Sequence, residues 1–471
     1  MKFSFDSVAH LYKHVYYNMP QSLKTFLGTL YGSIPIEKRY GTLYSHYLEV
    51  YKQFEEGDKQ FQEDYLYNKT LETILFAEQN IQFYQQSFAK HGVSASDFKS
   101  LDDLQKFPTM AKEDIKKHIE EMYTQSREKA VAYFSGGSSS SPTKFYHPIY
   151  TSRAKHKAYS VFTLEKGGYN LRDRSILLKG REVVDVEKDV YWDYEPVDNF
   201  LNVTSSYVSS EKFPFIYKQA LKFKPKFLFG YLSVILNFVS SSKAYNLDPL
   251  AIKGIILTSE TVHAQDIEIL KAFFGDISIF IDYGHTERVV GAYKLDFGDY
   301  HFMNAYGIPR VVNQEIIGTS LDNFVMPFIN YKTSDEVDGD ISYFDNSDIA
   351  KSVHNIKGRS QDYLVADDYR LISTSTLYVG HNLSTEVVSN IQYQQSEPGK
   401  VKVLVEKNRC DIDKNEILAG LNKLVKKGIS FDVEIVDFIA TSNRGKKIVC
   451  KQNLDIESIK HKIVKSDLAL N

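Results

Sequence analysis

Cysteine is almost missing from this sequence, which contains only Cys410 and Cys450 among its 471 residues. Two cysteines at this separation form no metal-binding pattern, and so sparse a use of cysteine fits a reducing compartment. Long hydrophobic runs are missing as well. No stretch reaches the roughly 18 apolar residues of a membrane-spanning helix, and the first residues lack the apolar run of a signal peptide. We therefore expect a cytoplasmic protein without a transmembrane segment.

A large excess of charge of either sign is also lacking. The formal net charge is −3, so no strongly basic face is implied and we expect no nucleic-acid partner. Hydrophobic residues at 43% and charged residues at 25% are typical of an ordinary globular protein. A chain of this length can bury a large core, which predicts two or more domains. The composition leaves the oligomeric state open.

Three motifs that would indicate an enzyme class are absent. The sequence contains no G-x-x-x-x-G-K-[ST] and no G-x-G-x-x-G, so two common glycine-rich phosphate-binding loops are excluded. A nucleophile elbow of the form G-x-S-x-G also fails, because Ser140 stands where its last glycine belongs. A serine hydrolase is therefore disfavoured.

The sequence does contain a stretch rich in glycine and serine at residues 131–146, VAYFSGGSSSSPTKFY. Adjacent glycines let the backbone turn successive N–H groups toward one anion, while serines and a lysine add hydroxyl donors and a positive charge. Such a stretch can bind a polyphosphate, although a flexible linker is the commoner meaning of this composition. The candidate phosphate-binding residues are Ser135, Gly136, Gly137, Ser138, Ser139, Ser140, Ser141, Thr143 and Lys144.

Residues 253–281 predict the architecture of the larger part of the chain. A buried strand pattern (KGIILT) is followed by a helix pattern that ends at Gly275 and then by a second strand at residues 277–281. Strand, helix and strand at this length form a parallel crossover, so we expect an α/β fold. Open α/β sheets bind ligands at the carboxyl ends of their strands. Two segments follow such ends and should meet in one crevice: Ser259, Glu260, Tyr283, Gly284, His285, Thr286 and Glu287.

The rest of the chain predicts a helical beginning and a compact α+β unit at the end. Residues 1–125 are expected to be mostly helical, with one helix over residues 71–88, whose apolar stripe is interrupted at 77–80, and another over residues 113–123. Alternating or buried patterns predict strands at residues 175–179, 315–320, 325–331, 340–344, 401–406 and 431–438. An amphipathic helix is predicted at residues 415–425, and a glycine turn among charges at residues 357–362 is the best domain boundary.

Four further segments accompany the serine-rich stretch: IDYGHTERVVGAY at 281–293, PFINYKTSDEV at 327–337, IKGRSQDYLV at 356–365 and RGKKIV at 444–449. In this order and spacing the set resembles the adenylate-forming enzyme superfamily, nearest the branch of phenylacetate–CoA ligase and the CapK-type capsular polysaccharide proteins. The resemblance covers nearly the whole chain. It implies a large N-terminal domain of parallel and mixed sheets with helices over residues 1–358, a hinge at 359–362, and a small mobile α+β domain over 363–471 that acts as a lid.

The resemblance also implies a role for each matching residue. The serine-rich stretch would hold the β- and γ-phosphates of ATP, Tyr283 would stack on adenine, and Thr286 would donate to the α-phosphate. Glu287 would hold Mg²⁺, for which the alternative is a salt bridge. Asp335 and Arg359 would bind the ribose hydroxyls. Lys446 is implied as the catalytic lysine, although the adjacent Lys447 could be the matching residue instead. Gln361 is implied as the hinge. The other residues implied to line the nucleotide site are Ser259, Glu260, Gly284 and His285.

The implied reaction joins a small carboxylic acid to ATP, giving an acyl-adenylate and pyrophosphate, after which the acyl group passes to CoA or to an amine. The CapK branch suggests a role in cell-surface polysaccharide biosynthesis. Two positions depart from the family, because Ser140 and Ser334 stand where glycines are usual. These departures keep a second class open, a catalytically degenerate protein that binds a nucleotide or an acyl-adenylate. The sequence does not name the acid.

Overall fold

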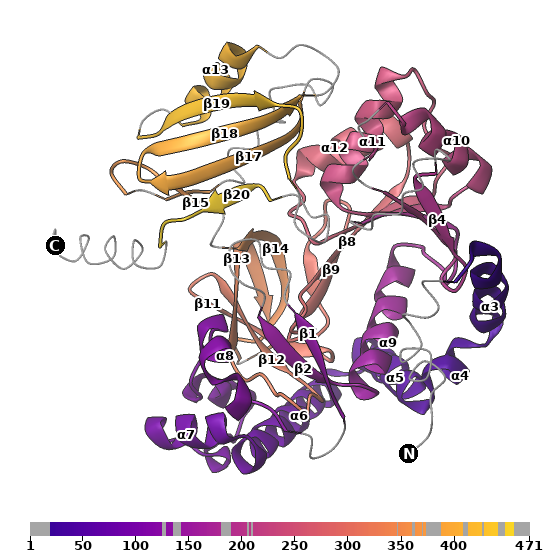
Figure 1. Cartoon of the computed structure of the whole chain (residues 1–471). Helices are drawn as coiled ribbons and strands as arrows, with labels where there is room; N and C mark the ends of the chain where they lie inside the picture. The colour runs from indigo at the N-terminus through magenta and orange to yellow at the C-terminus, as the bar shows by residue number, and fades with distance from the viewer. Residues whose placement is uncertain are drawn as a thin grey trace.

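The structure is a computed structural model of the whole chain (Figure 1). It describes residues 19–124, 129–134, 143–179, 190–204, 207–208, 211–345, 347–359, 363–369, 371–373, 388–407, 413–425, 428–440 and 448–455. Several of the predicted site residues lie outside this set: Ser135, Gly136, Gly137, Ser138, Ser139, Ser140, Ser141, Gln361 and Lys446.

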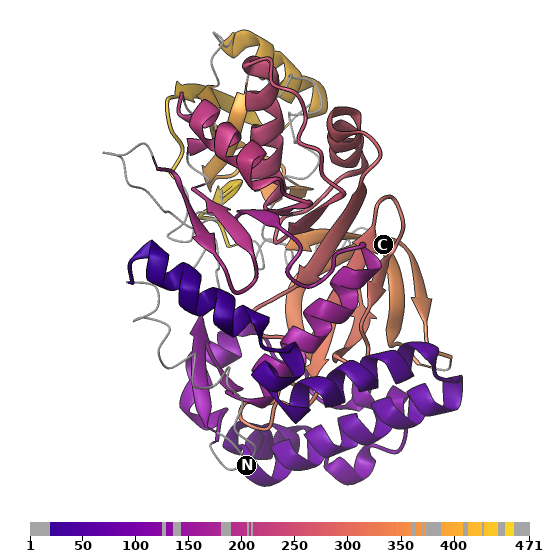
Figure 2. The same cartoon turned by 90° about the vertical axis from the view of Figure 1, so that its right-hand side faces the viewer.

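The N-terminal part is helical over the described residues, as the sequence predicts. Its elements are α3 (Gln21–Ser33), α4 (Ile36–Tyr40), α5 (Thr42–Glu56), α6 (Lys59–Asn80), α7 (Gln82–His91), η1 (Ala95–Asp97), η2 (Leu101–Lys106), α8 (Lys112–His118) and η3 (Ile119–Glu121). Figure 2 shows the indigo and purple helices gathered along one end of the molecule, below the orange strands. Within the described residues, no helix combines the length and the apolarity needed to cross a membrane.

Two details of this helical part differ from the prediction. The single helix expected over residues 71–88 is divided at Ile81, which takes an extended conformation and is buried, so that α6 ends at Asn80 and α7 begins at Gln82. Helix α8 ends at His118, and a 3-10 turn replaces the rest of the helix expected over residues 113–123. Local periodicity predicted that these helices exist but not where each one ends.

A twelve-stranded mixed sheet forms the centre of the molecule, in the order β11-β12-β13-β14-β10-β9-β8-β7-β6-β3-β5-β4 among the described residues. Strands β5, β3, β6, β7 and β8 run parallel, and the others are antiparallel. The bounds are β3 (Ser175–Leu178), β4 (Trp192–Glu195), β5 (Phe200–Val203), β6 (Phe227–Gly230), β7 (Gly254–Thr258), β8 (Ser278–Gly284), β9 (Gly291–Leu295), β10 (Tyr300–Phe302), β11 (Gly307–Val312), β12 (Glu315–Ser320), β13 (Tyr331–Tyr343) and β14 (Ala350–Arg359).

The predicted parallel crossover is confirmed at β7, α12 and β8. Helix α12 (Ala264–Phe274) ends at Gly275, whose φ of +86° only glycine adopts readily, and the chain then returns as β8 beside β7. The other helices of the sheet are α9 (Thr151–Lys166), α10 (Phe213–Phe223) and α11 (Leu232–Ala244). The mixed α/β class expected from the sequence is therefore correct.

The strand predicted over residues 325–331 is wrong, because β13 begins only at Tyr331. The preceding residues are buried, but side chains accept their backbone N–H groups in place of a neighbouring strand. The Phe328 N–H donates to Ser320 Oγ at 2.9 Å, and the Ile329 N–H donates to Tyr84 Oη at 2.9 Å. Apolar residues in this stretch therefore indicate burial, which the sequence pattern cannot distinguish from a strand.

The last part of the chain forms a separate four-stranded sheet in the order β19-β18-β17-β20 (Figure 1, top). It has a hydrophobic core of its own, which includes Leu364, Val403, Leu421 and the free thiol of Cys450. The described elements of this part are β15 (Tyr363–Val365), β16 (Leu371–Ser373), β17 (Val388–Glu397), β18 (Lys400–Lys407), α13 (Lys414–Leu424), β19 (Ser430–Val436) and β20 (Cys450–Gln452), and β15 and β16 pair with each other in a two-stranded sheet. This is an α+β unit, as expected.

Candidate functional site

The serine-rich stretch spans two paired antiparallel strands, β1 (Ala130–Phe134) and β2 (Lys144–Pro148), and its central residues connect them in sequence. Phe134 and Lys144 are paired across the hairpin, so the stretch begins and ends at one point of the molecule. Thr143 is buried at its end, and the Lys144 ammonium lies 4.8 Å from the centre of the Tyr146 ring. The hairpin fixes both ends of the candidate phosphate-binding stretch.

The carboxyl ends of β7 and β8 lie side by side, as the topology predicts. Thr258 and Asp282 are paired in register, so the turn that begins with exposed Ser259 and half-buried Glu260 lies beside the end of β8. Ser259 has a φ of +65°, which turns the chain sharply. Thr261 Oγ1 then donates to the Lys357 carbonyl at 3.4 Å, which brings this turn to β14.

Tyr283 and Asp335 meet at the end of β8, although 52 residues separate them in sequence. The Tyr283 hydroxyl donates to Asp335 Oδ2 at 2.7 Å. Asp335 is buried and is paired across the sheet with Arg359, whose side chain lies outside the described residues. The His285 ring lies edge-on to the Tyr283 ring with the centres 5.9 Å apart, and Gly284 ends the strand in an exposed position. The expected adenine-stacking and ribose-binding residues are thus neighbours.

Ser334, just before Asp335, occupies the position at which the family usually has glycine. Its φ is +62°, the left-handed conformation that glycine adopts without strain. Its N–H donates to Glu315 Oε1 at 3.1 Å, which fixes this conformation against β12. Ser334 therefore adopts the left-handed conformation that a glycine would adopt at this position without strain.

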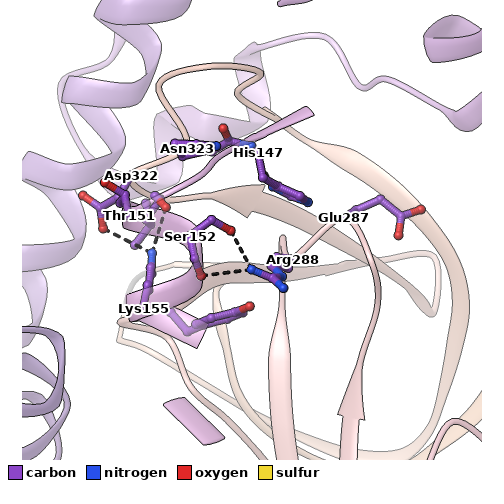
Figure 3. Close-up of a pocket in the computed structure, with 11 residues that line it drawn as sticks. His147, Thr151, Ser152, Lys155, Glu287, Arg288, Asp322 and Asn323 are labelled. Carbon is purple, nitrogen blue, oxygen red and sulfur yellow. Dashed lines mark hydrogen bonds and ion pairs between the residues drawn. The ribbon is translucent and has the colours of Figure 1, made fainter. Parts of the chain in front are cut away.

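Glu287 is buried, with an exposed fraction of 5%, and one of its oxygens is held by a tyrosine. The Tyr331 hydroxyl donates to Glu287 Oε1 at 2.9 Å. Among the described residues, no lysine or arginine forms an ion pair with this carboxylate, so the alternative of a salt bridge is not observed there. Figure 3 shows that the carboxylate points away from Lys155 and Asp322.

This environment fits a magnesium ligand. The described residues contain no cluster of three or more candidate metal ligands. Mg²⁺ commonly takes only one or two carboxylates from the protein and completes its shell with phosphate oxygens and water. Glu287 is such a carboxylate, with one oxygen oriented by a hydroxyl.

Thr286, half-buried beside Glu287, is held through its backbone. His147 Nε2 lies 2.9 Å from the Thr286 carbonyl oxygen, and the Asn323 amide lies 3.4 Å from His147 Nδ1. Burial, helped by the Arg288 guanidinium, lowers the pKa of His147 to about 3, so the imidazole is neutral. Figure 3 shows His147 and Asn323 beside the chain that carries Glu287 and Arg288.

A small pocket adjoins this turn, lined by His147, Pro148, Thr151, Ser152, Lys155, Glu287, Arg288, Tyr306, Leu321, Asp322 and Asn323 (Figure 3). The Arg288 guanidinium donates to the Ser152 carbonyl at 2.9 Å and to Ser152 Oγ at 2.6 Å, at the start of α9. These contacts tie the residue after Glu287 to α9.

An ion cluster borders the pocket. Lys155 Nζ lies 3.2 Å from Asp322 Oδ2, and Lys69 Nζ lies 2.7 Å from Asp322 Oδ1. Burial alone would raise the pKa of Asp322, but the two lysines outweigh it and lower that pKa to about 2. Burial lowers the pKa of Lys155, while Asp322 opposes this shift. The cluster ties α6 and α9 to the chain that follows β12.

Sequence reasoning missed His147, Asn323 and the contact between Tyr331 and Glu287. The only sequence signal for His147 is its alternation with Phe145 on β2, where both side chains are buried. A single histidine in such a pattern gives no indication of its partner, which is 139 residues away.

Comparisons with known proteins agree with this architecture. No protein-family model matches the chain. The chain is 24% identical to Protein CapK of Staphylococcus aureus over 461 residues, which cover 94% of this chain and 99% of CapK. In structure it is similar to 2-hydroxyisobutyryl-CoA ligase in the postadenylation state in complex with R3-HIB-AMP, with a TM-score of 0.62 at 11% identity, covering 86% of this chain and 93% of the ligase.

The chain has the fold of the adenylate-forming enzymes. It is also similar to the acyl acid amido synthetase GH3.15, with a TM-score of 0.50 at 12% identity, covering 83% of this chain and 92% of the synthetase. The resemblance found in the sequence is confirmed as a similarity: CapK matches nearly the whole chain, and the fold is shared with the CoA ligase and the amido synthetase. Within that fold, the contact of Tyr283 with Asp335 and the contact of Tyr331 with Glu287 lie at the end of β8 and the start of β13.

Proposed function

We propose that this protein is an ATP-dependent carboxylic acid ligase that forms an acyl-adenylate. A carboxylate oxygen of the acid attacks the α-phosphorus of ATP and forms a new O–P bond. The bond from that phosphorus to the oxygen bridging to the β-phosphate breaks, and pyrophosphate leaves with the electron pair. The observation that carries the proposal is the meeting of Tyr283, from the end of β8, with the Asp335 carboxylate, from β13.

The chain's own residues divide this work. Tyr283 offers an aromatic face to adenine, and the buried Asp335 carboxylate accepts hydrogen bonds from ribose hydroxyls. Glu287, oriented by Tyr331, is the residue suited to hold Mg²⁺, which when bound neutralises charge on the phosphates. The serine-rich stretch supplies donors to the β- and γ-phosphates, with Thr286 at the α-phosphate. Ser259, Glu260, Gly284, His285 and Arg359 complete the walls of the nucleotide site.

The acyl acceptor is CoA or an amine. Similarity to the CoA ligase supports CoA, and similarity to the acyl acid amido synthetase supports an amine. The CoA ligase matches the chain with a TM-score of 0.62 and the acyl acid amido synthetase with a TM-score of 0.50. The similarity to CapK supports a place in capsular or other cell-surface polysaccharide biosynthesis, with a small acid as substrate and a cytoplasmic location.

A second candidate function is nucleotide or acyl-adenylate binding without turnover. The observation that favours it is that serines occupy two positions where the family has glycine, Ser140 and Ser334. ATP–pyrophosphate exchange separates the two candidates. The enzyme is expected to incorporate labelled pyrophosphate into ATP with at least one acid of a panel of small carboxylic acids. Binding of ATP without exchange, across aliphatic, aromatic, hydroxy and amino acids, would favour the binding protein.

The small C-terminal unit supplies a further test through Lys446. Removing one preorganised positive charge from a site that stabilises developing negative charge costs about 10²–10³ in rate. We therefore expect Lys446→Ala to lose exchange activity by about that factor while ATP binding is retained. Lys447→Ala is the matched control and should keep exchange activity. The reverse outcome would move the assignment to Lys447.

A further inference from the structure

His147 connects two segments that the proposed function uses separately. It lies on β2, three residues after Lys144, at the end of the hairpin that carries the serine-rich stretch. Its Nε2 lies 2.9 Å from the carbonyl oxygen of Thr286, in the turn that presents Glu287. The side chain has an exposed fraction of 2%, so water does not compete for this contact.

The hydrogen-bond network fixes which ring nitrogen carries the proton. Asn323 Oδ1 accepts from the Met326 N–H at 3.2 Å and from the Val325 N–H at 3.4 Å. The Asn323 NH₂ group therefore faces His147 Nδ1, at 3.4 Å, and that nitrogen acts as the acceptor. The proton is left on Nε2, which donates to the Thr286 carbonyl. The ring is neutral, so it acts on the turn through geometry and not through charge.

The same turn is held from a second side. Tyr331 donates to the Glu287 carboxylate at 2.9 Å, while His147 holds the backbone one residue earlier. The turn cannot move relative to β2 without breaking the hydrogen bond between the buried His147 ring and the Thr286 carbonyl, which leaves a buried donor without that acceptor.

We propose that His147 is a positioning residue, which fixes the Thr286–Glu287 turn to the strand that follows the serine-rich stretch. The turn and β2 are then held together through this imidazole. This inference rests on the proposed function, because it assigns His147 to the same nucleotide site. The competing interpretation is packing alone, since the His147 ring also lies edge-on to Tyr133 with the centres 5.1 Å apart.

Binding measurements with two ligands distinguish these interpretations. Adenosine contacts the Tyr283 and Asp335 end of the site but has no phosphate, whereas ATP with Mg²⁺ also needs the serine-rich stretch and the turn. For His147→Phe, which keeps an aromatic ring but loses the donor, calorimetry should show MgATP binding weakened about 10–100-fold. Adenosine binding should stay within about twofold of wild type, because Phe preserves packing at a site remote from adenosine.

A second pair of variants tests the donor itself. Glutamine can place its amide nitrogen near the position of Nε2, so His147→Gln should recover MgATP affinity to within about fivefold of wild type. Asparagine reaches only the position of Nδ1, so His147→Asn should bind MgATP as weakly as His147→Phe. If His147→Phe does not fold, the comparison of Gln with Asn decides the question on its own.

Ile74→Ala provides the stability control, because Ile74 is fully buried in α6 and belongs to neither segment of the site. It should lower the unfolding temperature and leave both affinities unchanged. His147→Phe with wild-type MgATP affinity, or with equal losses for both ligands, would overturn the positioning role while the proposed function stands. A wild-type protein that binds neither ligand would overturn both.

Discussion

At the scale of single residues, Asp335 is the proposed ribose-binding residue, and its carboxylate already accepts a hydrogen bond from the Tyr283 hydroxyl. Asp335→Ala should weaken ATP binding by about 10–100-fold, since hydrogen bonds to a charged group are each worth about 1.5–3 kcal/mol. Binding of inorganic pyrophosphate should change much less, because the carboxylate faces the ribose. Calorimetry with both ligands measures the difference, and Tyr283→Phe, which keeps the ring and the carboxylate, is the control. Equal losses for ATP and pyrophosphate would remove Asp335 from the nucleotide site.

The left-handed conformation of Ser334 gives a prediction about stability. A non-glycine residue with φ near +62° carries a cost of about 1–2 kcal/mol, while glycine in a strand costs about 0.5–1 kcal/mol in backbone entropy. Ser334→Gly should therefore raise the free energy of unfolding by about 0.5–1 kcal/mol in urea titrations. The matched control is Ser342→Gly on the same strand, where φ is not positive and the side chain is exposed. This control should be destabilised, and a stabilised Ser342→Gly would contradict the explanation.

At the scale of the helices and strands, the ion pairs of Asp322 with Lys69 and Lys155 connect α6 and α9 to the chain after β12. Its folded pKa of about 2 lies below the ordinary 3.8, so its stabilisation is present above about pH 4. This contribution, about 2 kcal/mol, is lost as the pH falls toward 2. Asp322→Asn should cost about 3–5 kcal/mol at pH 7, because it leaves the buried Lys155 ammonium without its partner.

Urea titrations across pH test this cluster directly. Because burial lowers the pKa of Lys155, the deficit of Asp322→Asn should shrink as the pH rises and this lysine loses its proton. The control is Glu397→Gln, which removes an exposed partner of Lys400 and should change stability by less than about 1 kcal/mol. A deficit of the same size at pH 7 and pH 10 would mean that charge is not its cause.

The elements also show what the sequence could and could not predict. The β7–α12–β8 crossover was predictable because period and turn residues agree along one continuous segment. The break at Ile81 and the irregular residues before Tyr331 were not, because distant side chains such as Tyr84 decide where the backbone N–H groups bond. Of the site, the motifs indicated Tyr283, Glu287 and Asp335, whereas a lone histidine such as His147 carries no sequence signal for its partner.

In the whole molecule, the large sheet and the C-terminal α+β unit are connected where β14 ends at Arg359 and β15 begins at Tyr363. Lys446 belongs to the C-terminal part, and Thr286 and Glu287 belong to the large sheet. After the adenylate forms, the same lysine would block the side from which an acceptor enters. The two half-reactions are therefore expected to need different arrangements of the two units, with rotation at Gln361.

Gln361→Pro tests this rotation, because proline fixes φ near −65° and should lock one arrangement. The variant should still form the acyl-adenylate but fail to transfer the acyl group, so that stopped adenylate accumulates on the enzyme and is detected by mass spectrometry. Gln361→Ala keeps the backbone free to rotate and should complete the reaction. Wild-type turnover by Gln361→Pro would show that the moving-domain mechanism does not apply.

The hairpin that carries the serine-rich stretch has a consequence for how the protein could change its affinity. Because Phe134 and Lys144 are paired, the residues between them start and finish at neighbouring positions, and doubling their number would cost the fold only about 0.6 kcal/mol in closure entropy. Under the proposed function, a longer segment would dilute the effective concentration of its donors at the phosphates. The length of this segment is thus a variable by which insertion or deletion would alter nucleotide affinity while the fold remains almost as stable.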